Sequence, residues 1–204
     1  MQLIGMLDSP FVRRVAVTMR LLGLEYENRP VSVLKSYDEF RTIHPLVKAP
    51  TLICEDGEML IDSSLIIDYL ESLAGRSLMP TSVEDRRRAL QLIGVSLVAG
   101  EKVAQRIYER GMRPKEYRYT PWWERITEQL NSALDLLEEA LSGLGDDQWL
   151  FGDEITQADI SVAIAWRFAE FAAPPGEPPD VRPALAAFSA SAEALPEFIA
   201  CPLE

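Results

Sequence analysis

The first third of the chain alternates short apolar runs with segments whose apolar residues recur at helical spacing. The run at residues 3–7 predicts a buried strand, and the segment after Pro10 carries apolar residues at helical spacing as far as Leu22. Strands are also expected at residues 24–31, 50–54 and 59–61, and helices at 37–43 and 62–74. Asp56-Gly57 between the last two strands is a typical hairpin turn. The expected order is βαβαββα.

The pattern changes after residue 77, and no strand pattern follows. Residues 78–83 are expected to form a linker, and residues 84–204 an all-helical domain. Capping boxes at Ser82/Asp85 and Thr156/Asp159 predict two helix starts. Further helices are expected from Thr120 and near residues 183–192 and 195–199, and the prolines at 174, 175, 178 and 179 predict a rigid loop. Residues 1–77 and 84–204 are therefore expected to be two domains.

Composition excludes some partners. The chain has 204 residues and a net charge of −12, which argues against nucleic acid or an anionic membrane as the main partner. It lacks a long apolar run and a signal-peptide pattern at its start. Cys54 and Cys201 have neither metal-site nor redox spacing, so we expect packed thiols, no metal, and a cytoplasmic protein.

Ser9-Pro10 joins the first predicted strand to the first predicted helix. Proline suits the first helical position, which places Ser9 at the N-cap among unpaired backbone N–H groups. A hydroxyl at a helix N-terminus favours an anion there. The alternative is that Ser9 only caps the helix.

Two later stretches offer polar groups to a peptide-like ligand. Pro50 stands where a strand should begin, and a cis Ala49–Pro50 bond would leave the backbone of Ala49 facing a cleft. The alternative is an ordinary edge proline. Ser63 and the helix behind it could hold a carboxylate, while Asp62 could hold an ammonium group. The alternative there is simple capping.

Taken in order, these motifs resemble those of cytosolic glutathione transferases. The resemblance rests on Ser9-Pro10-Phe11-Val12-Arg13, on His44-Pro45-x-x-Lys48-x-Pro50, and on Asp62-Ser63 opening the third helix. The Ser-Pro-Phe start is most similar to the serine-type bacterial and tau-like branches. The family plan implies a thioredoxin-like α+β N-terminal domain, an all-α helical-bundle C-terminal domain and a homodimer. In that dimer, Glu71 and Asp68 would face Arg86–Arg88 of the other copy.

The resemblance also implies roles for individual residues. Glutathione would be the co-substrate, with Ser9 donating a hydrogen bond to its sulfur. The glutathione-binding residues would be Phe11, Lys35, Lys48, Ala49, Pro50, Asp62 and Ser63. Within that set, Ala49 would pair with the cysteinyl unit, Asp62 and Ser63 would hold the γ-glutamyl group, and Lys48 and Lys35 would face the glycine carboxylate. The electrophile site would draw on Tyr108, Met112, Tyr117, Tyr119, Trp122 and Trp123.

Several residues depart from the family pattern or leave two interpretations. His44 replaces the usual asparagine and is expected to be structural, while Asp62 is one methylene shorter than the commoner glutamate. Asp8 would oppose thiolate formation if it pointed inward. Arg13-Arg14 and Arg86–Arg88 are interpreted either as solvated faces or as the lining of a dimer cleft.

The expected activity is a glutathione transferase that activates the thiolate for attack on small hydrophobic electrophiles, as in detoxification. One alternative is a non-catalytic interaction or ligand-binding protein of the same fold. Another is a glutathione-dependent isomerase or dehalogenase, which would use the same thiolate. A thiol oxidoreductase would need a cysteine where this chain has Ser9.

Overall fold

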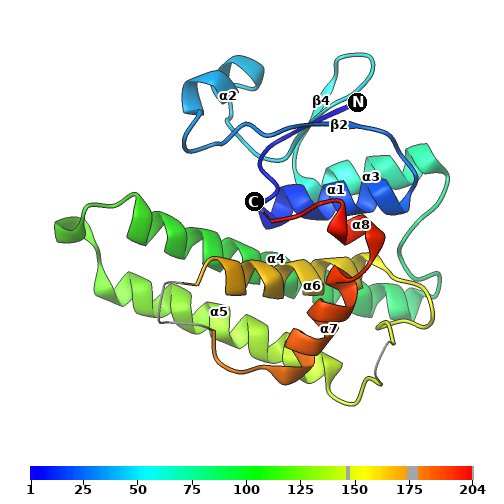
Figure 1. Cartoon of the computed structure of the whole chain (residues 1–204). Helices are drawn as coiled ribbons and strands as arrows, with labels where there is room; N and C mark the ends of the chain where they lie inside the picture. The colour runs from blue at the N-terminus through cyan, green and yellow to red at the C-terminus, as the bar shows by residue number, and fades with distance from the viewer. Residues whose placement is uncertain (146–147, 174–178, 204) are drawn as a thin grey trace. The chain divides into compact units, whose positions relative to one another are not determined.

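The computed structural model describes residues 1–145, 148–173 and 179–203, and it separates into two compact units (Figure 1). The first unit comprises residues 1–78 together with 194–204, and the second comprises residues 79–193. The expected assignment of all of 84–204 to the helical domain is therefore wrong for the last eleven residues. Of the expected proline-rich loop, residues 174–178 lie outside the described residues.

The first unit follows the expected βαβαββα order. Its elements are β1 (Gln2–Ile4), α1 (Pro10–Leu21), β2 (Glu27–Arg29), α2 (Tyr37–Ile43), β3 (Thr51–Ile53), β4 (Met59–Leu60) and α3 (Ser63–Ala74). The strand order is β2-β1-β3-β4, with β1 parallel to β2 and antiparallel to β3. The strands are shorter than expected because only three residues of β2 pair with β1. A small mixed sheet with flanking helices confirms the thioredoxin-like α+β expectation for this unit.

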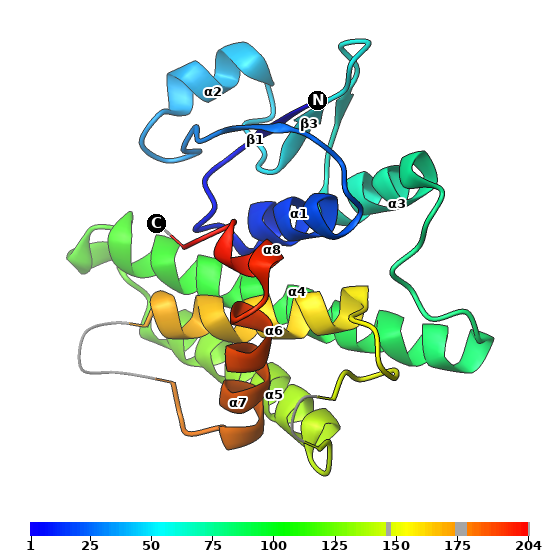
Figure 2. The same cartoon turned by 45° about the vertical axis from the view of Figure 1, so that its right-hand side comes forward.

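Apolar residues from alternate positions of β1 cover the two faces of this sheet. Ile4 packs with Phe40 of α2 and with Val31, while Leu3 next to it points to the opposite face. Figures 1 and 2 show α2 on one side of the sheet and the neighbouring helices α1 and α3 on the other. The loop after β1 therefore delivers Ser9 to the start of a helix whose body is fixed against the sheet.

The C-terminal segment returns to this unit and packs on α1. The helix α8 (Pro196–Ile199) lies beside α1 in both views (Figures 1 and 2). Arg13 of α1 is 1 % exposed, and its Nε donates to the carbonyl oxygen of Cys201 at 2.7 Å. Its Nη2 donates to the carbonyl oxygen of Phe198 at 3.4 Å, and its guanidinium lies over the ring of Phe198. These contacts explain why residues 194–204 belong with the first unit.

The second unit is helical. It contains α4 (Val83–Gly111), the 3₁₀ turn η1 (Lys115–Tyr117), α5 (Thr120–Leu141), α6 (Gln157–Phe171) and α7 (Pro183–Glu193). The capping box at Thr156/Asp159 is confirmed, with Asp159 Oδ2 accepting from the Thr156 N–H at 2.7 Å. At the start of α4, Ser82 is the N-cap and its Oγ accepts from the Asp85 N–H at 3.0 Å, which is one of the two hydrogen bonds of the expected box. The α4 helix packs against both α5 and α6, and α6 is buried nearly all round. Among the described residues, no helix is long and apolar enough to cross a membrane.

Candidate functional site

Ser9 occupies the N-cap position of α1 without capping it. Its backbone is extended and Pro10 follows at the first helical position, as expected. Its carbonyl accepts the Arg13 N–H at 2.9 Å, but its side chain makes no capping hydrogen bond. The helix therefore begins at Pro10 without using the Ser9 hydroxyl, although an N-cap serine normally accepts a backbone N–H.

A buried arginine connects α1 to the start of α3. Arg14 Nη1 donates to Ser63 Oγ at 3.1 Å and to Ser64 Oγ at 3.0 Å. Its Nε is buried and has no hydrogen-bond partner among the described residues. Burial lowers the pKa of the Arg14 guanidinium to about 10, while the charge of Asp62 acts to raise it. Arg14 thus places a positive charge directly behind the Ser63 hydroxyl.

The interpretation of Arg13 and Arg14 as a solvated face or as the lining of a dimer cleft is wrong. Both side chains are buried, at 1 % and 4 % exposed. Arg14 was missed as a site residue because a charged side chain on a helix is usually solvated. The only sequence signal for it was the uninterrupted apolar surroundings of Arg13-Arg14 in a helix that had to cover a sheet.

Asp62 and Ser63 differ in exposure. Asp62 is the N-cap of α3, and its Oδ1 accepts from the Ser64 N–H at 3.0 Å, so the capping interpretation is confirmed for this residue. Its carboxylate remains exposed, which leaves room for a second partner. Ser63 is 3 % exposed and contacts Arg14. The start of α3 therefore presents an exposed carboxylate beside a buried hydroxyl backed by a cation.

The segment before β3 lies against the loop after β1. The Ala49–Pro50 peptide bond is cis, which decides between the two interpretations that the sequence left open. Ile4 is opposite Thr51 in the sheet, so the chain after Ile4 runs beside the chain before Thr51. A Cβ at Gly5, whose φ is +141°, would lie 3.1 Å from the Cβ of Ala49, and only glycine permits this close approach.

Side chains from the same two segments also meet. Lys48 Nζ lies 5.8 Å from the ring centroid of Phe11, so a cation stands over this half-buried ring. Phe11 is not part of the fully buried core, so its ring stays partly accessible. The contact of Phe11 with Lys48 joins the Ser9–Arg13 motif to the His44–Pro50 motif, and Arg14, the residue after the first motif, contacts Ser63 of the third.

Asp8 is half-buried next to Ser9 in the sequence and interacts electrostatically with the exposed Lys35. Burial raises the pKa of the Asp8 carboxyl, while the Lys35 charge and the Ser9 backbone N–H oppose this effect. His44 is structural as expected, because its Nδ1 accepts from the Leu46 N–H at 3.3 Å within a turn.

In the second unit, only part of the expected aromatic set comes together. Tyr108, Met112 and Trp122 line one pocket of about 510 Å³. Tyr117 and Tyr119 do not line it and are strongly exposed. Trp123 lies instead in a second pocket with Arg106, Arg110 and Arg118, residues that the sequence analysis did not single out. Within the described ranges, no three His, Cys, Asp or Glu side chains gather as a metal site requires.

Comparison with known proteins identifies the family. A model of the glutathione S-transferase N-terminal domain matches residues 3–78, and a model of the corresponding C-terminal domain matches residues 120–191. The chain is 27 % identical over 179 residues to an uncharacterised GST-like protein of Escherichia coli K12, covering 84 % of this chain and 83 % of the relative. It is 27 % identical over 157 residues to the maleylacetoacetate isomerase of Pseudomonas aeruginosa, covering 72 % and 71 %.

The structural similarity extends over the whole chain. A glutathione transferase family member from Pseudomonas fluorescens Pf-5, whose crystal structure holds bound glutathione, superimposes with a TM-score of 0.84. The two are 27 % identical, and the match covers 100 % of this chain and 98 % of the other. Together with the two domain models, this similarity shows that the chain belongs to the glutathione transferase family.

Proposed function

We propose that this protein binds glutathione through its first unit and activates the thiol with Ser9 for attack on small hydrophobic electrophiles. The observation that carries the proposal is the Ser9 hydroxyl, which stands at the N-terminus of α1 and makes no capping hydrogen bond. It can donate to a thiolate in the field of the helix end. A detoxifying role in the cytoplasm is consistent with two free, buried thiols, Cys54 and Cys201.

The free energy by which Ser9 and the helix end would have to stabilise the thiolate is moderate. A thiol with a pKa near 8.5 is only a few per cent thiolate at neutral pH, and lowering that pKa by about two units requires about 2.7 kcal/mol. A charge-assisted hydrogen bond and a helix N-terminus supply energies of this order. Ser9 would act as a hydrogen-bond donor and would not itself ionise. The thiolate would then attack the electrophile.

The rest of the peptide would be held by the groups around Ser9. The backbone of Ala49 would pair with the cysteinyl unit, and Lys48 or Lys35 would attract the glycine carboxylate. Ser63 would donate to the γ-glutamyl carboxylate, while the exposed Asp62 would hold the ammonium group. Because Ser63 Oγ accepts from Arg14, its own hydrogen is directed away from Arg14 and toward an acceptor such as that carboxylate.

The test is a pH titration of the ultraviolet band of bound thiolate in the wild type and in Ser9→Ala. The variant should still bind glutathione, but the thiol pKa should return toward its solution value, with conjugation at neutral pH falling by about 25-fold because the thiolate fraction falls to a few per cent. Ser142→Ala in the helical unit is the matched control and should change neither quantity. An unchanged thiol pKa in Ser9→Ala would sink the proposal, and absence of bound thiolate in the wild type would favour the non-catalytic alternative.

An isomerase is a second candidate, favoured by the similarity to the maleylacetoacetate isomerase of Pseudomonas aeruginosa. The same thiolate would add to a conjugated cis double bond, allow rotation about the resulting single bond, and leave again as glutathione. The number of glutathione molecules consumed per turnover distinguishes the two activities. Conjugation of an activated aryl halide consumes one glutathione per turnover, whereas isomerisation of a cis-conjugated acid consumes none.

We also propose that two copies pair through α3 and α4. Leu65, Tyr69 and Leu73 form an apolar stripe on α3 and are 65 %, 37 % and 51 % exposed. Of the acidic residues expected to face Arg86–Arg88, Asp68 is exposed, but Glu71 already accepts from Ser77 Oγ and the Leu78 N–H. Light scattering should show a dimer that Leu65→Asp dissociates. A wild-type particle of 22.9 kDa would contradict the pairing.

A further inference from the structure

Val47, in the turn before β3, has a backbone conformation that valine rarely adopts. Its φ is +47°, in the left-handed region, and among the described residues it is the one non-glycine residue with a positive φ. In that region the Cβ comes close to the following carbonyl oxygen, and a β-branched side chain makes the conformation still less favourable. Such residues concentrate at functional sites and persist only where surrounding contacts hold them.

The side chain of Val47 supplies one such contact. It is half-buried and packs against the apolar cluster around Ile4 and Phe40. The side chain of Ala49 packs against the same cluster, while Lys48 between them is exposed. Removal of this apolar surface from water stabilises the packed position and offsets the cost of the left-handed backbone.

Hydrogen bonds fix the backbone on both sides of Val47. Its N–H donates to the carbonyl oxygen of His44 at 3.0 Å, which closes a β-turn that ends at Val47. The carbonyl oxygen of Lys48 accepts from Thr51 Oγ1 at 2.6 Å. The conformation of Val47 therefore sets the direction in which the chain passes from the turn to the residues before β3.

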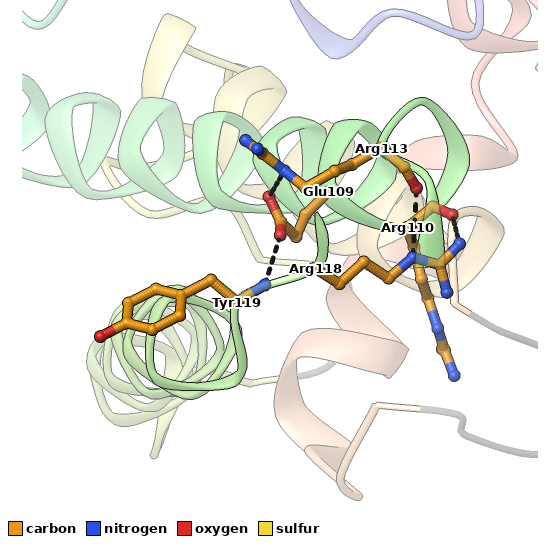
Figure 3. Close-up of polar contacts among 5 residues, drawn as sticks. All are labelled: Glu109, Arg110, Arg113, Arg118 and Tyr119. Carbon is orange, nitrogen blue, oxygen red and sulfur yellow. Dashed lines mark hydrogen bonds and ion pairs between the residues drawn. The ribbon is translucent and has the colours of Figure 1, made fainter. Parts of the chain in front are cut away.

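The turn between α4 and α5 in the helical unit is held in a different way. Glu109 of α4 accepts from Arg113 Nε at 2.8 Å and from the Tyr119 N–H at 3.1 Å (Figure 3). Hydrogen bonds to a carboxylate fix that turn, and none of the described residues from 112 to 119 has a positive φ. The turn before β3 depends instead on neutral hydrogen bonds and on the packing of Val47, so truncation of this side chain should release it.

We propose that Val47 is a positioning residue for glutathione, an inference that rests on the proposed function of the first unit. Packing of its side chain holds the backbone left-handed, and this backbone directs the next two residues to the peptide. The side chain of Lys48 then lies beside Phe11, with Nζ 5.8 Å from the ring centroid, and Ala49 would present its backbone to the cysteinyl unit. A site whose groups are already in place loses less conformational entropy when the ligand binds.

The test measures glutathione affinity by calorimetry in Val47→Ala and Val47→Gly. Alanine removes most of the packed side chain and still disfavours a positive φ, so fewer molecules have the competent turn and the affinity should fall about tenfold. Glycine removes more of the side chain but adopts a positive φ readily, so the affinity should fall only about threefold. In both variants KM for glutathione should rise with little change in kcat.

The order of the two variants separates positioning from packing. If Val47 only fills the core, the loss follows the number of carbon atoms removed, and glycine is worse than alanine. That order, or an unchanged affinity in both variants, would overturn the inference while leaving the proposed function intact. A wild type that does not bind glutathione would refute the proposed function, and the inference with it.

Ile53→Ala is the matched control. Ile53 packs against the same cluster, but it pairs with Gln2, at the end of β1 away from the Ser9 loop. The variant loses more apolar surface than Val47→Ala, so it should unfold at a lower urea concentration. Its glutathione affinity should nevertheless stay within about twofold of the wild type. A loss as large as that of Val47→Ala would show that the cluster as a whole sets the affinity, which would also overturn the inference.

Discussion

Arg13 and Arg14 are neighbours on α1, and both are buried, yet they contact different parts of the first unit. Arg13 donates to backbone carbonyls of the C-terminal segment, whereas Arg14 donates to the hydroxyls of Ser63 and Ser64 at the start of α3. Consecutive residues of an α-helix point about 100° apart, so one short motif can face two neighbours. Two adjacent arginines can thus have different roles: Arg13 anchors the C-terminal segment, and Arg14 is proposed to position Ser63 for ligand binding.

The interactions that compensate for burial of the charge also differ between Arg13 and Arg14. Arg13 caps carbonyls near the end of α8, and its ring contact with Phe198 adds a cation–π interaction. The buried Nε of Arg14 has no hydrogen-bond partner in the described part of the chain, and its burial disfavours the charged form. We therefore expect Arg13 to contribute to stability and Arg14 to contribute to ligand binding.

The largest effect is expected for Arg13→Met. The substitution leaves the carbonyls of Phe198 and Cys201 without their buried donor, which should lower the free energy of unfolding by about 3 kcal/mol. Urea denaturation followed by circular dichroism measures the change. Arg20→Met on the exposed end of the same helix is the control, with an expected loss under about 1 kcal/mol. A similarly small loss for Arg13→Met would mean that the C-terminal segment is held by apolar packing alone.

Arg14→Met should give the opposite pattern. Removal of a charge that burial disfavours should change the free energy of unfolding little, whereas glutathione affinity should fall by about 2 kcal/mol because Ser63 loses its charged partner. Calorimetry measures the affinity, and a rise in KM with little change in kcat would identify a ground-state binding role. Arg14→Lys should recover part of the affinity. A large loss of stability with unaltered KM would remove the distinction from Arg13.

A smaller effect is expected when the hydroxyls that Arg14 contacts are removed one at a time. Ser63→Ala should weaken glutathione binding by about 1.5 kcal/mol, because a charged carboxylate loses a donor. Ser64→Ala is the matched control, since Ser64 also accepts from Arg14 but serves as an internal partner in our proposal. Its loss of affinity should be under about 0.5 kcal/mol. Equal losses in both variants would show that Arg14 acts through the helix start as a whole.

The smallest effect concerns Asp8→Asn at the other end of the motif. Burial raises the pKa of Asp8 above its ordinary value of 3.8, so the folded form disfavours the carboxylate. Between pH 3.8 and the raised pKa of the folded state, the folded protein binds more protons at Asp8 than the unfolded chain does. The free energy of unfolding therefore falls as the pH rises through this range. Asp8→Asn should therefore be slightly more stable than the wild type at neutral pH, and the difference should vanish at pH values below 3.8. Thermal melts across pH test the sign, and a variant less stable at neutral pH would refute it.

The order of the elements and most of their ends could be predicted from the sequence, because they depend on residues that are close along the chain. Ser82 and Thr156 cap the helices that their spacing to Asp85 and Asp159 predicts. Gly75 ends α3 in the left-handed region, with φ at +61°. Ser9-Pro10, Ala49-Pro50 and Asp62-Ser63 were identified for the same reason, since each marks the start of a strand or helix.

Contacts between residues far apart in the chain could not be predicted from the sequence and became visible in the folded structure. Hydrophobic periodicity identified α1 but could not show that Arg13 bonds to a carbonyl 188 positions away, nor that Arg14 stands behind Ser63. It likewise could not separate Tyr108, Met112 and Trp122 from Trp123, which packs with arginines in another pocket. Capping and turn chemistry act within one turn of chain, whereas the burial of a charge depends on which distant groups fold against it.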